Sequence, residues 1–220
     1  MRRTPRTPAA LTALGRVRLS RHVFLRNFLY SEIGNVDRVP NLPEDPDLAI
    51  AAGTGLATAL LDPLVETFGP IEVRSAYRSP TLNGYGNARQ REGRRGYECA
   101  SNAADAAHHI RDRRAADGRM GASASVVIPW LIDRPERHRR DLAFRMRDHR
   151  PFDAMWMFPK QRAFNLSWRE VVDRGPARKV SSYVPPRGTL IGAWEAPPLG
   201  APARAAAWAG FRPFRSIAYP

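Results

Sequence analysis

The chain has 220 residues, which is enough for one ordinary domain with a real hydrophobic core. Apolar residues make up 43% of it and charged residues 25%, and this composition excludes an intrinsically disordered protein. The net charge of +14 favours anionic partners such as nucleic acid or cell-wall polymers. Only Lys160 and Lys179 are lysines, however, and a bias toward arginine also follows from a GC-rich genome.

Cysteine usage and apolar runs narrow the class of protein. Cys99 is the only cysteine, so the chain has neither an intrachain disulfide nor a cysteine-rich metal site. The apolar run at 8–14 is too short for a signal peptide and is followed by several arginines. No run of about 18 apolar residues predicts a helix that spans a membrane. We expect a soluble protein, made in the cytoplasm, without a membrane span.

Three segments precede the first predicted strand. Residues 1–18 are rich in arginine, proline and alanine, which predicts a flexible basic arm. Apolar residues at helical spacing follow Ser20, and the sequence predicts a short helix over 20–34. Leucines repeat at the same spacing up to a Gly-Pro pair, which predicts a longer helix over 48–68.

The middle of the chain alternates strands with helices. Residues 71–75 alternate in polarity and predict a strand, after which Ser79-Pro80 opens a turn or short helix. Residues 84–96 are rich in glycine and arginine, which is typical of a loop. A helix over 102–116, a buried strand over 126–128 and a charged helix over 133–150 follow.

The last elements define the expected domain boundaries. Two strands are predicted over 155–158 and 163–168, near a tight turn. From 185 onward, prolines and glycines interrupt every pattern. We therefore expect one domain over 19–184 and a C-terminal extension over 185–220 that packs on it.

A series of motifs follows the order of these elements. It comprises His22, Phe24, Leu25, Phe28, Ser31 and Glu32, then Asn41 and Pro43, then a stretch from Leu61 to Asn83 that contains Ser75-Ala76-Tyr77-Arg78-Ser79-Pro80. In order and spacing, these motifs resemble the front half of the bacterial D-alanyl-D-alanine zinc carboxypeptidase family. The resemblance is continuous from His22 to Asn83.

The resemblance implies an α+β fold of the hedgehog/DD-peptidase type, with a small, mainly antiparallel sheet flanked by helices. It also implies a zinc ion held by His, Asp and His, from the motif H-x-x-G-x-A-x-D and a later E-x-x-H. In such a site the zinc polarises an amide carbonyl and the glutamate takes a proton from the attacking water. Arg78, with Tyr77 and Asn83, would bind the substrate.

The zinc motifs themselves are degenerate in this chain. His109 stands in the position of the first ligand, Ser125 in that of the aspartate and Asn165 in that of the second histidine. Arg162 stands where the glutamate belongs, and Ser167 follows in the same strand as Asn165. A hydroxyl and an amide are weak zinc ligands, and an arginine cannot act as a base. Only His109 remains as a candidate metal ligand.

Two other metal sites stay open. In a second register, Ser101-x-Ala103-x-Asp105 matches G-x-A-x-D and places Glu98 in the first ligand position. An unrelated site could use four residues of the next segment, His108, His109, Asp112 and Asp117.

A basic cluster supports a different class of function. The loop over 84–96 and its flank contain Arg89, Arg91, Arg94 and Arg95, with Tyr85 and Tyr97 nearby. Arginines with neighbouring aromatic rings can bind the phosphates and bases of nucleic acid.

We expect a D-Ala-D-Ala peptidase-like domain that is catalytically impaired or repurposed and that recognises a peptide or a peptidoglycan fragment. The alternatives are an active zinc-dependent cell-wall peptidase with an altered ligand set and a basic nucleic-acid-binding protein. No cofactor is expected unless zinc binds. A cell-wall role would require release by lysis or in a phage-like particle.

Overall fold

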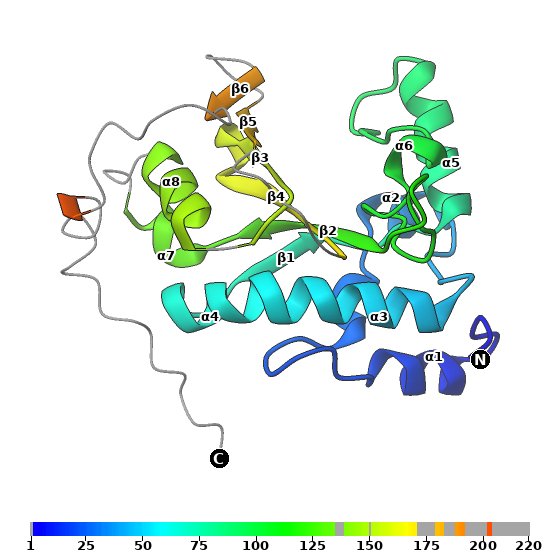
Figure 1. The fold of residues 1–220 in the computed structure, drawn as a ribbon. Coiled ribbons are helices and arrows are strands. Elements are labelled where there is room, and N and C mark those ends of the chain that lie inside the picture. The colour runs from blue at the N-terminus through cyan, green and yellow to red at the C-terminus, as the bar shows by residue number, and fades with distance from the viewer. Residues whose placement is uncertain are drawn as a thin grey trace.

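A computed structural model of the chain describes residues 2–134, 139–149, 151–170, 179–182, 188–191 and 202–203. The fold is α+β, with a mixed sheet lying on one long helix (Figure 1). Most of the C-terminal extension expected over 185–220 lies outside the described residues.

Six strands form one open sheet in the order β1-β2-β4-β3-β5-β6. All neighbouring strands are antiparallel except β3 and β5, which are parallel. The mainly antiparallel sheet that we expected is therefore present, with one parallel pair of strands. The strands are β1 (Glu72–Ser75), β2 (Gly121–Val127), β3 (Ala154–Phe158), β4 (Ala163–Arg169), β5 (Lys179–Ser182) and β6 (Gly188–Ile191).

The helix predicted over 48–68 is confirmed as a continuous helix of three parts: α3 (Pro46–Leu56), the π-helical segment η2 (Ala57–Leu61) and α4 (Asp62–Phe68). Its first turn is capped by Asp45, whose side chain accepts a hydrogen bond from the Leu48 N–H at 3.0 Å. Pro63 lacks an N–H and would clash with the preceding turn of an α-helix. The π-helical turn lies directly before this proline and accommodates it.

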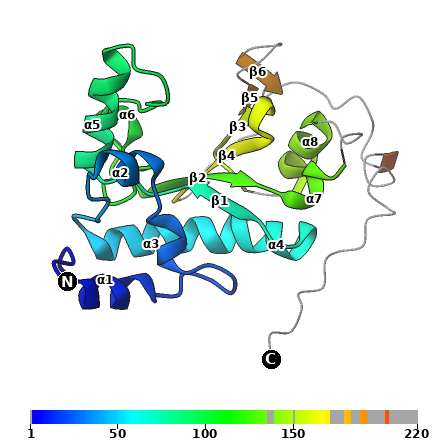
Figure 2. The ribbon, with the colours of Figure 1, turned by 180° about the vertical axis from the view of Figure 1, so that it is seen from behind.

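This helix is also the most apolar segment that the structure describes. Over Pro46–Phe68 it has 23 residues and a mean hydropathy of 1.6, which by length and composition alone would suffice to cross a membrane. In the fold it is the core helix beneath the sheet, and its leucines are buried there (Figures 1 and 2). This position is consistent with the expectation that the chain has no membrane span.

The core fills the space between this helix and one face of the sheet. Side chains alternate between the two faces of a strand, and the core residues on the lower face are apolar. They are Ala122, Ala124, Val126, Phe164, Leu166, Met155, Met157 and Val180, all buried with Leu56, Leu60, Leu61 and Leu64 of the helix. Trp168 packs on the same helix at Gly55, where any larger residue would collide with the indole ring.

The N-terminal segments differ from the expected arm and helix. Residues 1–18 contain helix α1 (Pro8–Gly15), which forms because Thr7 caps it and Pro8 occupies its first position. The helix expected over 20–34 is divided into a 3-10 turn η1 (Leu25–Phe28) and helix α2 (Glu32–Asp37). Ser31 causes this division, because its side chain caps a new helix through the Gly34 N–H at 3.3 Å.

The prediction of a loop over 84–96 is wrong for its first half, because residues 84–91 belong to helix α5 (Pro80–Arg91). Ser79 caps this helix by accepting from the Leu82 N–H at 3.1 Å, and Pro80 stands at its first position. Conversely, the helix expected over 102–116 ends after α6 (Asn102–Asp105). Ala107 has a φ of 58°, so the chain turns there instead of continuing the helix.

The segment between β2 and β4 supplies the remaining elements. The charged helix expected over 133–150 is present in the described residues as α8 (Arg139–His149). The short helix α7 (Pro129–Ile132) precedes it and was not predicted, and the 3-10 turn η3 (Pro159–Gln161) joins β3 to β4. Helices α5 and α6 lie at one end of the sheet and α7 and α8 at the other (Figure 1).

Candidate functional site

The upper face of the sheet is polar over four adjacent strands. Because the side chains alternate, the residues that do not point to the core helix point to this face. The register places Ser123 opposite Ser167 and Ser125 opposite Asn165. Trp156 of β3 lies between Asn165 and Ser181 of β5. The face therefore presents hydroxyl and amide groups beside one indole ring.

A cavity of about 340 Å³ lies on this face. Its lining residues are Ser123, Ala154, Met155, Trp156, Asn165, Ser167 and Ser181 of the sheet, together with Asp105, His108 and His109. The last three come from the end of α6 and the turn that follows it, which lies across β2 from β3 and β5 (Figure 1). This volume lies at the lower end of the range for small-ligand pockets.

Backbone contacts hold this turn against the sheet. The Ser123 N–H donates to the carbonyl of His108 at 3.0 Å, and the Arg78 N–H donates to that of His109 at 3.0 Å. Gly121 lies under the carbonyl of Ala107, where a side chain would collide with it. The turn thus depends on long-range contacts that fix both histidines at the cavity.

A chain of hydrogen bonds ends at the cavity. Arg169 Nη2 can only donate, so His108 Nε2 accepts from it at 3.1 Å. His108 Nδ1 therefore carries the hydrogen and donates to Ser123 Oγ at 3.3 Å. The hydroxyl groups of Ser123 and Ser167 share a hydrogen bond of 2.7 Å, in which either can be the donor. Ser167 lines the cavity, where its hydroxyl group can contact a ligand.

His108 remains neutral at physiological pH in this arrangement. Burial lowers the pKa of its imidazole, and the positive charge of Arg169 lowers it further. A neutral ring with its hydrogen on Nδ1 is the tautomer that the hydrogen-bond chain requires.

His109 presents a lone pair to the same cavity. Its Nδ1–H donates to the carbonyl oxygen of Ala76 at 2.7 Å, which leaves Nε2 as an acceptor. No described residue forms a hydrogen bond with that nitrogen. The side chain is buried, and burial, followed by the charge of Arg78, holds the pKa of His109 well below its usual value. His109 is therefore a neutral acceptor opposite the hydroxyl of Ser167.

Asp105 is the one carboxylate among the lining residues. Its Oδ2 lies 3.2 Å from Nη2 of Arg78, and both side chains are nearly buried. Burial raises the pKa of Asp105, an effect that the charge of Arg78 opposes. Arg78 also donates to Cys99 Sγ at 2.7 Å and to the carbonyl of Glu98 at 3.2 Å. Its guanidinium lies behind Asp105 and is not part of the cavity wall.

Tyr77 and Asn83, expected beside Arg78 in a substrate site, do not line the cavity. The Tyr77 hydroxyl donates to Asp112 Oδ2 at 2.7 Å, and burial is the main cause of the raised pKa of this phenol. Asn83 Nδ2 donates to the carbonyl of Ala100 and to Asn102 Oδ1, both at 2.9 Å. In this structure both side chains hold neighbouring loops in place.

The degenerate zinc positions lie close together. His109, Asn165 and Ser167 all line the cavity. Ser125 lies next to them and donates a hydrogen bond to Asn165 Oδ1. Because Oδ1 is used in this way, the amide Nδ2 of Asn165 is the group that can donate to a ligand.

The residues present do not fit a catalytic zinc ion. Among the described residues, no group of three or more His, Cys, Asp or Glu side chains could hold a metal. His109 has the geometry of a ligand, with one ring nitrogen fixed by a carbonyl. Asp105 also lines the cavity, but the position expected for the third ligand holds the amide of Asn165. Arg162, in the position of the base, is exposed and donates to the carbonyl of Ile132 at 2.6 Å.

The two alternative metal sites each bring only some of their residues to the cavity. Asp105, from the second register, does reach the cavity, whereas Glu98 of that register does not line it. Of the third set, only His108 and His109 reach the cavity, because Asp112 is bound to Tyr77 and Asp117 lies on the exposed loop beside Arg119.

The basic cluster around α5 is partly neutralised within itself. Glu92 lies 2.9 Å from Arg89 and 3.3 Å from Arg94. The guanidinium of Arg89 also stacks over the ring of Tyr85, 4.9 Å from its centroid. Arg89 and Arg94 are therefore engaged within the protein.

Sequence reasoning missed Ser123, Trp156, Ser181 and Arg169 as residues of the site. Ser123 and Ser125 in one strand, and Asn165 and Ser167 in the other, alternate with apolar residues. That alternation was the available signal, because it indicates a strand with one polar face. The partner of His108 could not be found in this way, since Arg169 is distant in sequence.

Comparisons with protein-family models, with curated proteins and with solved structures gave no match.

Proposed function

We propose that the cavity binds the end of a short peptide, such as the D-Ala-D-Ala terminus of a peptidoglycan stem peptide, and that it does so without hydrolysing it. In this proposal the chain is a divergent member of the hedgehog/DD-peptidase fold whose metal site has been replaced by a hydrogen-bonding site.

The observation that carries the proposal is the presence of a hydroxyl group and a fixed acceptor in one cavity. Ser167 brings its hydroxyl group to the cavity, and His109 offers a lone pair on Nε2. A peptide unit has one carbonyl acceptor and one N–H donor, so it complements these two groups. Asn165 Nδ2 is available for a second carbonyl or a terminal carboxylate.

The same contacts argue against hydrolysis. A serine nucleophile needs a base that accepts its proton, whereas His108 donates its hydrogen toward the serines. His109 is a weak base because burial depresses its pKa. The metal ligands and the glutamate of a zinc peptidase are not brought together here. What remains is recognition of an amide.

A binding titration tests the proposal. Calorimetry with an N-acylated D-Ala-D-Ala peptide is expected to give saturable binding that weakens on the order of tenfold in Ser167→Ala and in His109→Gln, because each removes one hydrogen bond to the ligand. Thr58→Ala, which removes an exposed hydroxyl on η2, is the matched control and should bind like the original protein.

Stereochemistry supplies a second control. The L-Ala-L-Ala analogue has the same atoms and should bind more weakly if the cavity recognises the peptide end by shape. Absence of saturable binding, or equal binding by the original protein and both cavity variants, would contradict the proposal.

A further inference from the structure

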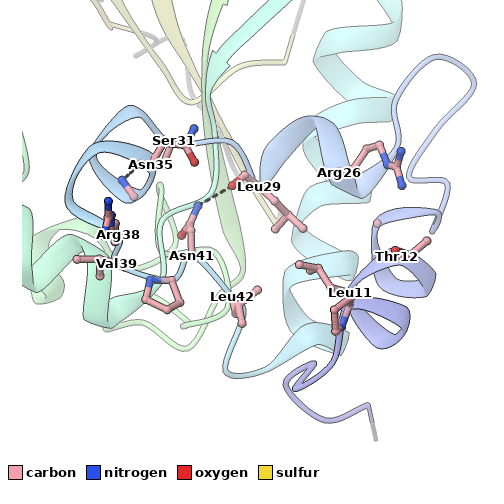
Figure 3. A pocket seen from close by; sticks show the side chains of 14 residues that line it. Leu11, Thr12, Arg26, Leu29, Ser31, Asn35, Arg38, Val39, Asn41 and Leu42 are labelled. Carbon is pink, nitrogen blue, oxygen red and sulfur yellow. Dashed lines mark hydrogen bonds between the residues drawn. The ribbon is translucent and has the colours of Figure 1, made fainter.

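A second cavity, a groove of about 670 Å³, lies on another side of the molecule, between α1 and α2. Its lining is Pro8, Leu11, Thr12 and Gly15 of α1, Arg26 and Leu29, and Ser31, Gly34, Asn35, Arg38, Val39, Pro40, Asn41 and Leu42. Figure 3 shows Leu29 and Leu42 between the two sides of the groove. The groove does not share a residue with the cavity on the sheet.

The charges of the groove are of one sign. Arg26 and Arg38 lie on opposite sides of it, and no lining residue is acidic (Figure 3). Among the described residues, neither guanidinium has an ion pair or a hydrogen bond, although other arginines such as Arg21 are paired. Arg26 is held in place by close packing on Gly15, where an added Cβ would lie 3.2 Å from Cβ of the arginine. The groove therefore presents two separated cations above an apolar floor.

Exposed apolar side chains gather on the segments around the groove. Leu11 lines it and is 36% exposed, while Tyr30 and Val36 are 52% and 77% exposed. Tyr30 directly follows the lining residue Leu29, and Val36 directly follows Asn35. An apolar occupant would cover Leu11, and an extended peptide can reach the arginines on both sides of the groove at the same time.

We propose that this groove docks a segment of a partner protein in which apolar side chains are flanked on both sides by acidic residues. The apolar side chains lie on Leu29 and Leu42, and the flanking carboxylates pair with Arg26 and Arg38. The charge complementarity is specific to the groove, because carboxylates can form two parallel hydrogen bonds with each guanidinium. This second site is independent of the peptide cavity on the sheet.

The test uses a fluorescent peptide with two leucines between two pairs of glutamates, titrated with the full chain and followed by anisotropy. Arg26→Glu and Arg38→Glu are each expected to weaken binding on the order of tenfold or more, since each replaces an attraction by a repulsion. Arg91→Glu is the matched control, because it makes the same charge change at an exposed site on α5. It should bind the peptide like the original protein.

A peptide with glutamines in place of the glutamates separates charge from shape without changing the protein. It should bind on the order of tenfold more weakly or worse if carboxylates pair with the two arginines. Because this comparison uses the unchanged protein, it remains valid if one of the arginine variants fails to fold.

The other outcomes would overturn the proposal. Equal weakening in Arg91→Glu would mean nonspecific attraction to a chain of net charge +14. Absence of binding would remove the peptide as occupant. Binding of dodecanoate, lost in Arg38→Glu while the peptide does not bind, would assign the groove to a small amphiphile instead.

Discussion

The two faces of the sheet are made by the same strands and have opposite properties. On the lower face, Ala124, Leu166 and Met155 are buried against the core helix, and side chains fill the space completely enough to exclude water. On the upper face, Ser123, Ser167 and their neighbours surround a cavity. Alternation in each strand thus separates the packed core from the polar cavity, since adjacent residues point to opposite faces.

The largest expected effect comes from the lower face. Leu166→Ala should destabilise the protein by about 2–5 kcal/mol, because it removes buried methyl groups and leaves a void in a packed core. Denaturant unfolding followed by circular dichroism measures this. A loss under about 1 kcal/mol would mean that the lower face is not the packed core described here.

A smaller effect is expected from the centre of the hydrogen-bond chain. Ser123 is 2% exposed, and Ser123→Ala removes both the acceptor of His108 Nδ1–H and the hydrogen-bond partner of the Ser167 hydroxyl group. The free energy of unfolding should fall by about 1–3 kcal/mol, the cost of leaving buried polar groups without partners. The same unfolding experiment on Thr58→Ala provides the comparison. If Ser123→Ala and Thr58→Ala are equally stable, the chain of hydrogen bonds has no structural role.

The histidines of the upper face make stability depend on pH. Burial places the folded-state pKa of His109, and that of His108, below the ordinary value of 6.5. Below pH 6.5 the unfolded chain therefore takes up protons that the folded chain does not, so stability present above 6.5 is lost as the pH falls.

Unfolding at pH 7.5 and at pH 5.5 should reveal this loss, with a limiting slope of about 1.4 kcal/mol per pH unit for each histidine. Restricting the range to above pH 5.5 reduces the contribution of Asp105, whose raised pKa has the opposite effect. His109→Gln should flatten the profile. An unchanged profile in that variant would place the titration elsewhere.

The smallest effect on stability is expected at the cavity wall. Ser167→Ala should change the free energy of unfolding by no more than about 1 kcal/mol, because water in the cavity can accept the hydrogen bond from Ser123. The same variant should lose peptide affinity, which is the sharpest separation of the two faces. A large loss of stability would assign Ser167 a structural role instead.

Local patterns in the sequence predicted the elements that local forces determine. The leucine spacing over 48–68 predicts the core helix because that helix buries one continuous apolar face. Ser79-Pro80 indicated where helix α5 begins, but its continuation over 84–91 was predicted as a loop because glycines and arginines are frequent there. The beginning of β2 was missed because alanine and serine alternate there with little contrast in hydropathy.

The candidate site could be predicted only in part for a related reason. The motif positions of Asn165, Ser167 and His109 do meet in the cavity. The place of His108 depends on a left-handed Ala107 and on the backbone of Ser123, neither of which a local pattern encodes. The hydrogen-bonding roles of the two histidines become visible only when the partners of each ring nitrogen are known.

The central claim is that the upper face recognises a peptide end without metal or turnover. It is tested most directly by equilibrating the purified, tag-free chain with zinc, removing unbound ions, and measuring metal content, D-Ala-D-Ala peptide binding and D-alanine release in one sample. The account predicts no stoichiometric zinc, binding that a chelator does not change, and no release of D-alanine. About one zinc ion per chain, lost in His109→Ala, together with chelator-sensitive release of D-alanine, would contradict it and identify an active metallopeptidase.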